Sequence, residues 1–474
     1  MYLRDIKPMF DSMHEECGVF GIYSPETRDV GNTVYYGLYA LQHRGQESCG
    51  IAVAYANKIE YHKGMGLIPE VFSGDALSSL PEGDIAIGHV RYSTTGASLA
   101  VNAQPIVFTG KCGKMAVAHN GNLTNADRLR AELIADNAVF QTTVDSEAIA
   151  MLINKFSDGD IVRGVLKACE CFKGSYALVV MTTDKLIAVR DPYGIRPLCV
   201  GKNMDEIVVA SESCALDAVG ANFLRDIEPG EVLVIDSTGM HSHRIEGRRK
   251  PAACIFEYVY FSRPDSILDG CSVYETRMAA GKILAENYPV EADIVSGVPD
   301  SAIVAARGYS QVSGIPYVEA LEKNRYVGRT FIQPDQKMRE DSVSVKMNPL
   351  RANIQGKRLV LIDDSIVRGT TSRRIVRMLK EAGAKEVHLR ICSPVIRHPC
   401  HLGIDMQSYN QLIGANKTEK EICEYIGADS LKYLTIDQLT KSCKAAKIGF
   451  CLGCFDGKYP YNPECDESGK FKFE

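Results

Sequence analysis

Short segments of alternating apolar and polar residues fill the first half of the chain, which is the pattern of strands with one buried face. The segment Gly174–Gly194 predicts two strands joined by a tight Thr-Asp-Lys turn, and Ile85–Thr94 and Lys114–Asn122 predict further strands. A helical period runs through Asp145–Phe156. This mixture predicts an α+β domain of packed sheets, which we expect to end near residue 245, before a basic stretch.

The second half of the chain has a different pattern. Asp293–Pro299 and Arg358–Asp364 are compact apolar runs, each followed by a polar loop and then a helical pattern. Apolar runs that alternate with helices predict an α/β domain whose parallel sheet is buried on both faces. Ligands of such sheets bind beyond the carboxyl ends of the strands, so we expect a site there. From about Cys400 the chain is polar and is predicted to be helical.

Composition and charge narrow the class of protein. With 474 residues the chain is long enough for two domains. Its net charge of -5 argues against a protein that coats nucleic acid. No apolar run approaches the roughly 20 residues of a membrane helix, and the N-terminus lacks the apolar core of a signal peptide. We therefore expect a cytoplasmic protein with no nucleic-acid or membrane partner, whose 16 cysteines are not structural disulfides.

One cysteine near the N-terminus belongs to a set of residues that suits amide hydrolysis. Cys17 is a candidate nucleophile, although a lone cysteine that opens a strand is more often simply buried. Arg91 suits a carboxylate, and the Asn120 side chain and Gly121 N–H suit an oxyanion. Asp145 opens a helix, where it either caps the helix or accepts an ammonium group. Together these groups fit hydrolysis of the side-chain amide of glutamine.

The sequence offers no obvious histidine as a base for this nucleophile. A different base becomes available if the chain is cut after Glu16, because the freed α-amine of Cys17 has a reference pKa of about 7.7–8.0. Thiol and base then belong to the same residue.

The strings CGVFGI, LQHRGQES, GHVRYSTTG, HNGNL and DSE, in this order, resemble the glutamine amidotransferase domain of the N-terminal-nucleophile class. The resemblance implies an antiparallel, helix-covered fold with Cys17 as nucleophile and Asn120 and Gly121 as the oxyanion hole. It also implies that Arg91 and Asp145 hold the glutamine carboxylate and amine, and that residues 1–16 are a propeptide. This class contains several synthases, so the first half alone leaves the ammonia acceptor open.

The most informative string of the second half is LVLIDDSIVRGTTSRR. A buried strand is followed by Asp363 and Asp364, which suit a ribose diol or a hydrated Mg²⁺. A small-residue loop then leads into a helix, whose N-terminus attracts phosphate. The donors that this loop offers are Gly369, Thr370, Thr371 and Ser372. An ordinary turn with a helix cap is the alternative, but the full string resembles the phosphoribosyl pyrophosphate signature of type I phosphoribosyltransferases.

Two further segments fit the same ligand. The string VSGVPDSA ends a strand with small residues, and the resemblance places a Mg²⁺-linked hydroxyl at Ser301, beside the two aspartates. The segment Lys323–Glu340 is long and basic, and its Arg325 and Arg329 are candidates to close over a pyrophosphate. A solvated loop is the alternative for this segment.

A second cysteine set is suggested by CLGC, which holds Cys451 and Cys454 in the polar tail. A single CxxC fits two buried cysteines, a redox pair or a metal site. Cys254 and Cys400 are placed to complete four thiolates, but zinc and iron both accept four thiolates, so the sequence alone leaves the metal open.

The two halves together resemble the amidophosphoribosyltransferase family, in its iron–sulfur, propeptide-bearing form. The resemblance implies a transfer of ammonia from glutamine to phosphoribosyl pyrophosphate at the start of purine synthesis. It further implies a [4Fe–4S] cluster on the four cysteines as a structural staple, Mg²⁺, inhibition by purine nucleotides, and a homotetramer. The expected division is a propeptide (1–16), an amidotransferase domain (17–245), a phosphoribosyltransferase domain (255–400) and a helical C-terminal segment (401–474).

Rival classes are a regulatory phosphoribosyl-binding protein, an iron–sulfur oxygen sensor and a sugar-phosphate amidotransferase. The first is expected to lose a nucleophile or an acid, whereas Cys17, Asp363 and Asp364 are present. In the second the enzyme motifs would be relics, and glutaminase activity that depends on phosphoribosyl pyrophosphate separates both from the enzyme. The third would lack the segment that carries the two aspartates.

Overall fold

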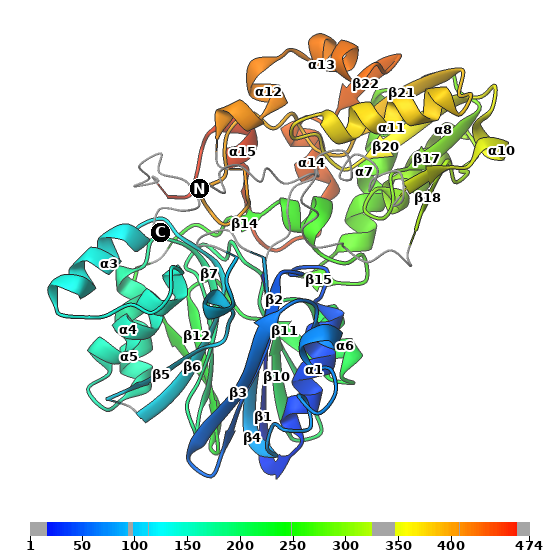
Figure 1. Cartoon of the computed structure of the whole chain (residues 1–474). Helices are drawn as coiled ribbons and strands as arrows, with labels where there is room; N and C mark the ends of the chain where they lie inside the picture. Colours follow the sequence, from blue (N-terminus) through cyan, green and yellow to red (C-terminus); the bar gives the residue numbers. More distant parts are fainter. Residues whose placement is uncertain are drawn as a thin grey trace, which may run out of the picture.

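The computed structural model describes residues 17–92, 98–111, 113–247, 249–324, 347–406 and 408–461. The first part of the chain forms two antiparallel sheets that face each other, and the second part forms a parallel sheet with helices on its faces (Figure 1). Both sheet types were predicted from the sequence. Strand β4 (Gly83–Arg91), strand β6 (Gly113–Leu123) and helix α4 (Asp145–Ser157) lie within a few residues of the predicted segments.

The larger antiparallel sheet has seven strands in the order β11-β9-β10-β1-β4-β2-β3. Its central strand β1 (Gly18–Arg28) follows Cys17 and is flanked by β10 and β4. The remaining strands are β2 (Ser48–Tyr55), β3 (Lys58–Met65), β9 (Cys199–Asn203), β10 (Glu206–Ala210) and β11 (Asn222–Asp226).

The second antiparallel sheet has six strands in the order β13-β12-β8-β7-β6-β5. The predicted hairpin is confirmed, because β7 (Gly174–Met181) and β8 (Leu186–Arg190) pair antiparallel. The other strands of this sheet are β5 (Ile106–Gly110), β12 (Glu231–Asp236) and β13 (Gly239–Arg244).

Apolar side chains from both sheets meet in one core, to which Val19 and Ile87 contribute from the first sheet and Ala118 and Val179 from the second. The outer face of the first sheet packs on α1 (Val30–Ala40) and α6 (Ser213–Ala218), with α2 (Ile68–Val71) beside them. The outer face of the second sheet packs on α3 (Ala126–Ala135), α4 and α5 (Ile161–Cys171). This gives four layers, with helices outside two sheets.

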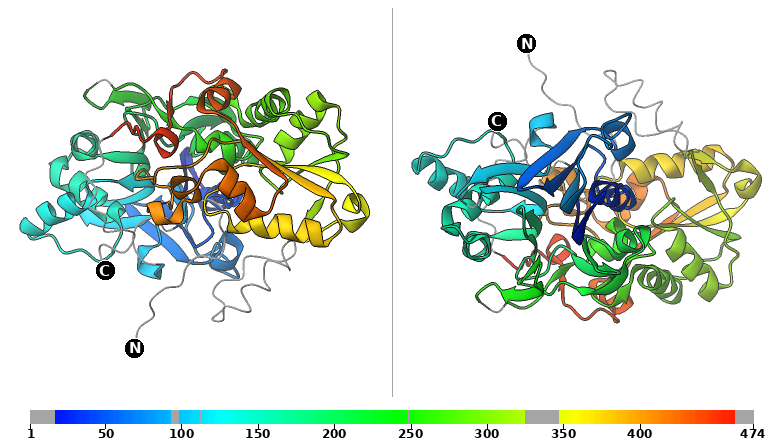
Figure 2. Two further views of the ribbon diagram at one scale, coloured as in Figure 1. Left: turned by 90° about the horizontal axis from the view of Figure 1, so that it is seen from above. Right: turned by 90° about the horizontal axis from the view of Figure 1, so that it is seen from below.

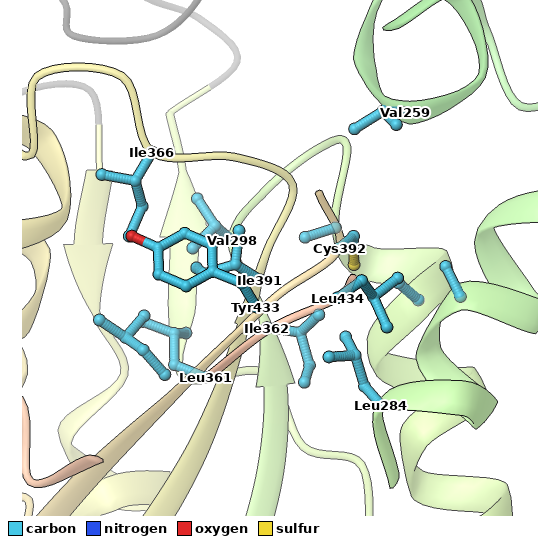
Figure 3. Close-up of a cluster of buried hydrophobic side chains, with 14 of the residues drawn as sticks. Val259, Leu284, Val298, Leu361, Ile362, Ile366, Ile391, Cys392, Tyr433 and Leu434 are labelled. Atoms are coloured by element: carbon cyan, nitrogen blue, oxygen red, sulfur yellow. The ribbon is translucent and has the colours of Figure 1, made fainter. Parts of the chain in front are cut away.

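The parallel sheet has four strands in the order β17-β20-β21-β22. Its strands are β17 (Ile294–Gly297), β20 (Arg358–Asp363), β21 (Glu386–Ile391) and β22 (Ser430–Tyr433). The apolar run of β20 is buried because helices α7 (Val273–Asn287), α8 (Ile303–Ser313) and α11 (Thr370–Glu381) contribute to the surrounding core. Figure 3 shows part of this core, where Ile362, Ile391 and Tyr433 lie close to the carboxyl ends of their strands.

The C-terminal segment is only partly helical. It contains α12 (Ile413–Asn416), α13 (Glu419–Ile426), α14 (Ile436–Ser442) and α15 (Gly453–Asp456), but its β22 is also the edge strand of the parallel sheet. The remaining short elements are η1 (Ala100–Asn102), β14 (Ala253–Cys254), η2 (Glu257–Phe261), β15 (Ile267–Leu268), β16 (Cys271–Ser272), β18 (Leu321–Lys323), β19 (Met347–Pro349), α10 (Arg351–Ile354), η3 (Tyr409–Gln411) and β23 (Phe450–Cys451).

The two parts of the molecule meet along the segment that holds β14, η2 and β15 (Figure 1). Strand β14 pairs in parallel with β23, so the end of the described chain is tied to the junction. Seen from above and from below, the parallel sheet lies to one side and helices α3–α5 lie to the opposite side (Figure 2). The junction therefore lies between two separately built cores.

Candidate active site

Cys17 stands at the entry to the central strand of the seven-stranded sheet. The following residue, Gly18, pairs with Val90 of β4, and the Cys17 thiol donates to the carbonyl oxygen of Tyr92 at 3.4 Å. The residue is 7% exposed. Burial raises the pKa of this thiol to about 11, so a neighbouring base is needed before it acts as a nucleophile at neutral pH.

Charged groups predicted to hold glutamine lie around this thiol. Arg91 lowers the pKa of the Cys17 thiol, whereas Glu47 and Asp145 raise it, so all three groups act on the sulfur. The register explains this arrangement, since Cys17 precedes β1, Arg91 ends the adjacent β4, and Asp145 begins α4. Three predicted site residues are therefore brought together from distant positions in the sequence.

Glu47 and His119 were not predicted, but they contact Arg91 and Asp145, the two residues that were predicted to hold glutamine. Arg91 donates to Glu47 at 2.6 Å, and both side chains are buried. Asp145 accepts a hydrogen bond from the backbone N–H of Leu123 at 3.0 Å, and the imidazole of His119 lies 3.5 Å from its other oxygen. Buried partners of this kind fix the rotamers of the groups that meet a ligand.

Asn120 and Gly121 lie together on β6 and have the properties of oxyanion donors. The amide nitrogen of the Asn120 side chain is buried and has no hydrogen-bond partner among the residues that the structure describes. Gly121 has a φ of +145°, and a Cβ there would lie 2.1 Å from the carbonyl oxygen of Ser175. Only glycine fits this close backbone approach. A side chain at residue 121 would displace the backbone that carries the predicted donor N–H.

The second predicted site lies at the carboxyl end of β20. Asp363 ends the strand, and Asp364 follows it and accepts hydrogen bonds from Ser301 and Ser365. Burial and the neighbouring charge of Asp364 raise the pKa of Asp363 well above its ordinary value. Burial also raises the pKa of Asp364, although Ser301 and Arg277 partly oppose the shift. A positive charge bound beside the two carboxylates would offset the burial and the neighbouring charge that raise these pKa values.

The predicted phosphate loop turns into α11 as expected. Gly369 precedes the helix with a φ of +80°, and a Cβ there would lie 2.9 Å from the Cδ1 atom of Ile413. Thr370 and Thr371 open the helix at or near the surface, and Ser372 is buried. Their backbone N–H groups belong to the first turn, where an α-helix has no internal acceptors for them.

The predicted lid residues Arg325 and Arg329 lie outside the described residues. The described part of that segment is residues 323–324, and its Lys323, in β18, forms an ion pair with Asp300.

The four predicted cluster cysteines converge at the junction. Cys254 and Cys451 face each other in the β14–β23 pair, and their thiols interact electrostatically with each other and with Cys400. Burial raises the pKa of Cys454 well above its ordinary value, and the other three thiols add to this shift. In the part of the chain that the structure describes, no group of three or more His, Cys, Asp or Glu side chains is arranged so that it could hold a metal ion.

A buried ionic network beside Cys17 was not predicted. It consists of Arg44, Glu212 and Glu257, whose side chains are at most 2% exposed. Arg44 lies inside LQHRGQES, a string that carries the family resemblance, and Glu257 lies in the segment FEYVYFSRPDS near the start of the second half. Charged residues inside those strings were the available signal, but which charges pair across the molecule depends on the fold.

Comparison with known proteins identifies the family. A glutamine amidotransferase domain model matches residues 89–218, and a phosphoribosyl transferase domain model matches residues 266–398. The amidophosphoribosyltransferase of Archaeoglobus fulgidus is 52% identical over 455 residues, which cover 95% of this chain and 99% of that protein. The amidophosphoribosyltransferase of Bacillus subtilis is 49% identical, with 94% of each chain covered. The chain belongs to the amidophosphoribosyltransferase family.

Solved structures agree with this family. The glutamine phosphoribosylpyrophosphate amidotransferase of Bacillus subtilis, complexed with ADP and GMP, has a TM-score of 0.89 and 48% identity, and the match covers 95% of this chain and 98% of that chain. A structure described as the allosteric regulatory enzyme of purine biosynthesis has a TM-score of 0.90 and 47% identity over 97% of this chain and 99% of that one. As an amidophosphoribosyltransferase family member, the chain is a glutamine-dependent phosphoribosyltransferase of purine biosynthesis.

Proposed function

We propose that the two sites divide the family reaction between them, with residues 17–245 releasing ammonia and residues 255–400 using it. In the first site Cys17 attacks the glutamine amide, and Asn120 and Gly121 stabilise the oxyanion. The C–N bond then breaks to release ammonia, and water hydrolyses the resulting glutamyl thioester to glutamate. Arg91 and Asp145 hold the carboxylate and the amine of glutamine. The support is the convergence of Arg91 and Asp145 on one buried thiol.

The base for this thiol is the α-amine of Cys17 itself, which becomes available when the segment 1–16 is removed as a propeptide. Because burial raises the pKa of the thiol, a base of pKa near neutrality is needed. An amine on the same residue has a reference pKa of about 7.7–8.0 and lies within reach of the sulfur by covalent geometry.

In the second site, the loop after β20 binds phosphoribosyl pyrophosphate. Asp363 and Asp364 face the ribose and, with Ser301, would hold Mg²⁺. Gly369, Thr370, Thr371 and Ser372 bind the 5-phosphate at the start of α11. The buried pair of carboxylates fits a divalent cation, which when bound neutralises charge on the departing pyrophosphate. Arg325 and Arg329 are the proposed lid over that pyrophosphate.

Ammonia then displaces pyrophosphate from C1 of the ribose, and the products are 5-phosphoribosylamine, glutamate and pyrophosphate. Ammonia is a nucleophile only when it is unprotonated. The buried position of both sites suits that requirement.

The four cysteines at the junction would hold a [4Fe–4S] cluster. Cys254, Cys400, Cys451 and Cys454 come from three separate segments and interact electrostatically, which fits a shared group between them. When bound, the cluster links the junction to the C-terminal segment.

Further proposals concern partners and location. The relative complexed with ADP and GMP supports purine nucleotides as feedback inhibitors of this chain. We also propose a homotetramer, a cytoplasmic location and no nucleic-acid partner. No helix in the described ranges is long and apolar enough to cross a membrane.

The thiol of Cys17 carries the proposal and can be tested directly. We expect Cys17→Ala to abolish phosphoribosylamine synthesis from glutamine, while synthesis from ammonium salts persists because the second site is intact. The matched control is Cys49→Ala, which removes another buried thiol from the same sheet and should keep both activities. Glutamine-dependent synthesis by Cys17→Ala at the wild-type rate would exclude the proposed nucleophile.

A further inference from the structure

Arg44 connects the two halves of the molecule beside the proposed nucleophile. Its guanidinium donates to Glu212 of the amidotransferase half at 2.6 Å and to both oxygens of Glu257, at 2.8 and 3.0 Å. Glu257 belongs to η2, in the half that carries the phosphoribosyltransferase core. Burial alone would lower the pKa of Arg44, but the charges of Glu257 and Glu212 raise it above its ordinary value. Arg44 and Glu257 therefore form an ion pair across the junction.

The same guanidinium holds the main chain of Cys17. The Nε atom of Arg44 donates to the carbonyl oxygen of Cys17 at 3.1 Å. A guanidinium is planar and its donors have fixed directions, so the two carboxylates that bind its Nη atoms also set the direction of its Nε–H. That carbonyl group is bonded to the Cα atom that carries the thiol and the α-amine of Cys17. The position of Glu257 therefore bears on the position of the nucleophile.

Glu257 is itself fixed by the phosphoribosyltransferase half. Its Oε2 atom accepts a hydrogen bond from Ser262 at 2.7 Å. Arg277 of α7 donates to the carbonyl oxygens of Tyr258 and Tyr260 at 3.0 Å and of Ser262 at 2.7 Å. Because the buried guanidinium of Arg277 binds three carbonyl oxygens, it fixes the main chain of η2 and with it the position of Glu257.

The other side of this support faces the phosphoribosyl site. One pocket is lined by Tyr258 and Arg277 together with Ser301 and Asp364. The charge of Arg277 also lowers the pKa of Asp364. The segment η2 therefore borders both sites. Its Glu257 lies toward Cys17, and its Tyr258, beside Arg277 of α7, lines the pocket of the carboxylate proposed for Mg²⁺ and the ribose.

We infer that Glu257 is a positioning residue for glutamine hydrolysis, contributed by the half that does not hold the nucleophile, and that it acts through Arg44 on the main chain of Cys17. This inference rests on the proposed role of Cys17. It makes the glutaminase site incomplete without the phosphoribosyltransferase half. It also gives phosphoribosyl pyrophosphate a route to glutamine hydrolysis, from Asp364 through Arg277 and η2.

The test is Glu257→Gln in the full-length enzyme, measured beside Asp269→Asn. The control breaks another buried ion pair across the same junction, since Arg190 binds Asp269 at 2.7 and 2.9 Å, but neither residue has a recorded contact with Cys17. We expect Glu257→Gln to lower kcat for glutamine hydrolysis by about 10- to 100-fold, the effect of a misplaced reacting group, with less than about a threefold change in KM. Ammonia-dependent synthesis should stay within about twofold in both variants.

A second variant keeps the result decisive if Glu257→Gln does not fold. Arg44→Lys keeps the positive charge but cannot reach two carboxylates and a carbonyl group in fixed directions, so we expect the same fall in kcat. Phosphoribosyl pyrophosphate should increase glutamine hydrolysis less in Glu257→Gln and in Arg44→Lys than in the wild type. Equal effects of Glu257→Gln and Asp269→Asn, or a wild-type kcat in Arg44→Lys, would overturn the inference. The Cys17→Ala experiment tests the proposed function separately.

Discussion

The side chains proposed to react or bind in both sites are held by hydrogen-bond partners. Arg91 is ion-paired with Glu47, and Asp364 accepts a hydrogen bond from Ser301. The motifs indicated the proposed site residues, because a nucleophile, a carboxylate clamp and a phosphate loop each need a particular residue type. Ser301 came from the family resemblance, but Glu47 could not be predicted. Its backbone N–H donates to the carbonyl oxygen of Arg91, and that register exists only after the strands have paired.

The two buried aspartates of the second site predict that the stability of the folded protein depends on pH. Because the folded state raises the pKa of Asp363 above the ordinary value of about 3.9, protonation favours folding. The stability contributed by this group is complete below about pH 4 and is lost as the pH rises through the folded-state pKa. In magnesium-free buffer we therefore expect Asp363→Asn to have a higher Tm than the wild type at pH 8, measured by calorimetry.

The amide in this variant keeps an acceptor for the backbone N–H of Asp364, which the carboxylate now bonds at 2.9 Å. Addition of Mg²⁺ should raise the Tm of the wild type but not that of the variant. Parallel Tm–pH curves for the two proteins would contradict the expectation.

Helices and strands were predictable where their pattern is long enough to show a period. The hairpin β7–β8 and the apolar strands β17 and β20 were predicted within a few residues. Strand β22 was not predicted. Its four residues, Ser-Leu-Lys-Tyr, do not form a compact apolar run like the one that predicted β17, and they are too few to reveal a period. Its pairing with β21 makes it a strand.

The turn into α11 predicts the effect of an added methyl group. Gly369→Ala should weaken binding of phosphoribosyl pyrophosphate, because φ of +80° strains an alanine by about 1–3 kcal/mol and its Cβ would press on Ile413. We expect KM for phosphoribosyl pyrophosphate to rise about tenfold, the equivalent of 1.4 kcal/mol. The matched control is Gly356→Ala, which has φ of +72° in open space and should keep its KM. A shared change in KM would assign the effect to stability alone.

The pairing of β14 with β23 predicts a loss of iron and of stability together. Cys451→Ser removes one proposed thiolate from this pair, so we expect less than a full complement of four irons per chain and a lower Tm. Iron analysis and thermal unfolding under anaerobic conditions measure both. Cys423→Ser is the control, since its thiol donates to the carbonyl oxygen of Ala428, away from the junction. Full activity in Cys451→Ser without bound iron would rule out a structural cluster.

At the scale of the whole molecule, length and pattern predicted two sheet systems and their order along the chain. The contact between the two halves could not be predicted, because it is stabilised by charged residues that pair across a large distance in the sequence. Arg44 with Glu257 and Arg190 with Asp269 are such pairs. A sequence shows these residues as ordinary charges, and only the folded chain shows that they are buried.

These ion pairs predict that the halves unfold together. Asp269→Asn should lower the free energy of unfolding by about 3 kcal/mol, because it leaves Arg190 charged at a buried position. The loss should be at the lower end for such pairs, since Arg190 also donates to the carbonyl oxygens of Gly194, Arg196 and Ile227. Denaturant titration should show one transition in wild type and variant. Two separated transitions in the wild type would contradict a joint held by buried charge.

The order in which the parallel sheet is completed has a consequence for how the protein is made. A ribosome that has already synthesised both antiparallel sheets and β21 has not yet supplied β22 or β23. Domains fold in the order of their synthesis, so the nascent chain passes through a stage in which β21 is an exposed edge and Cys254 waits for its partners. Unpaired edges are templates for aggregation. Among the nascent chains of this protein, those that stall before residue 430 are therefore expected to be the ones most often bound by chaperones and cleaved by proteases.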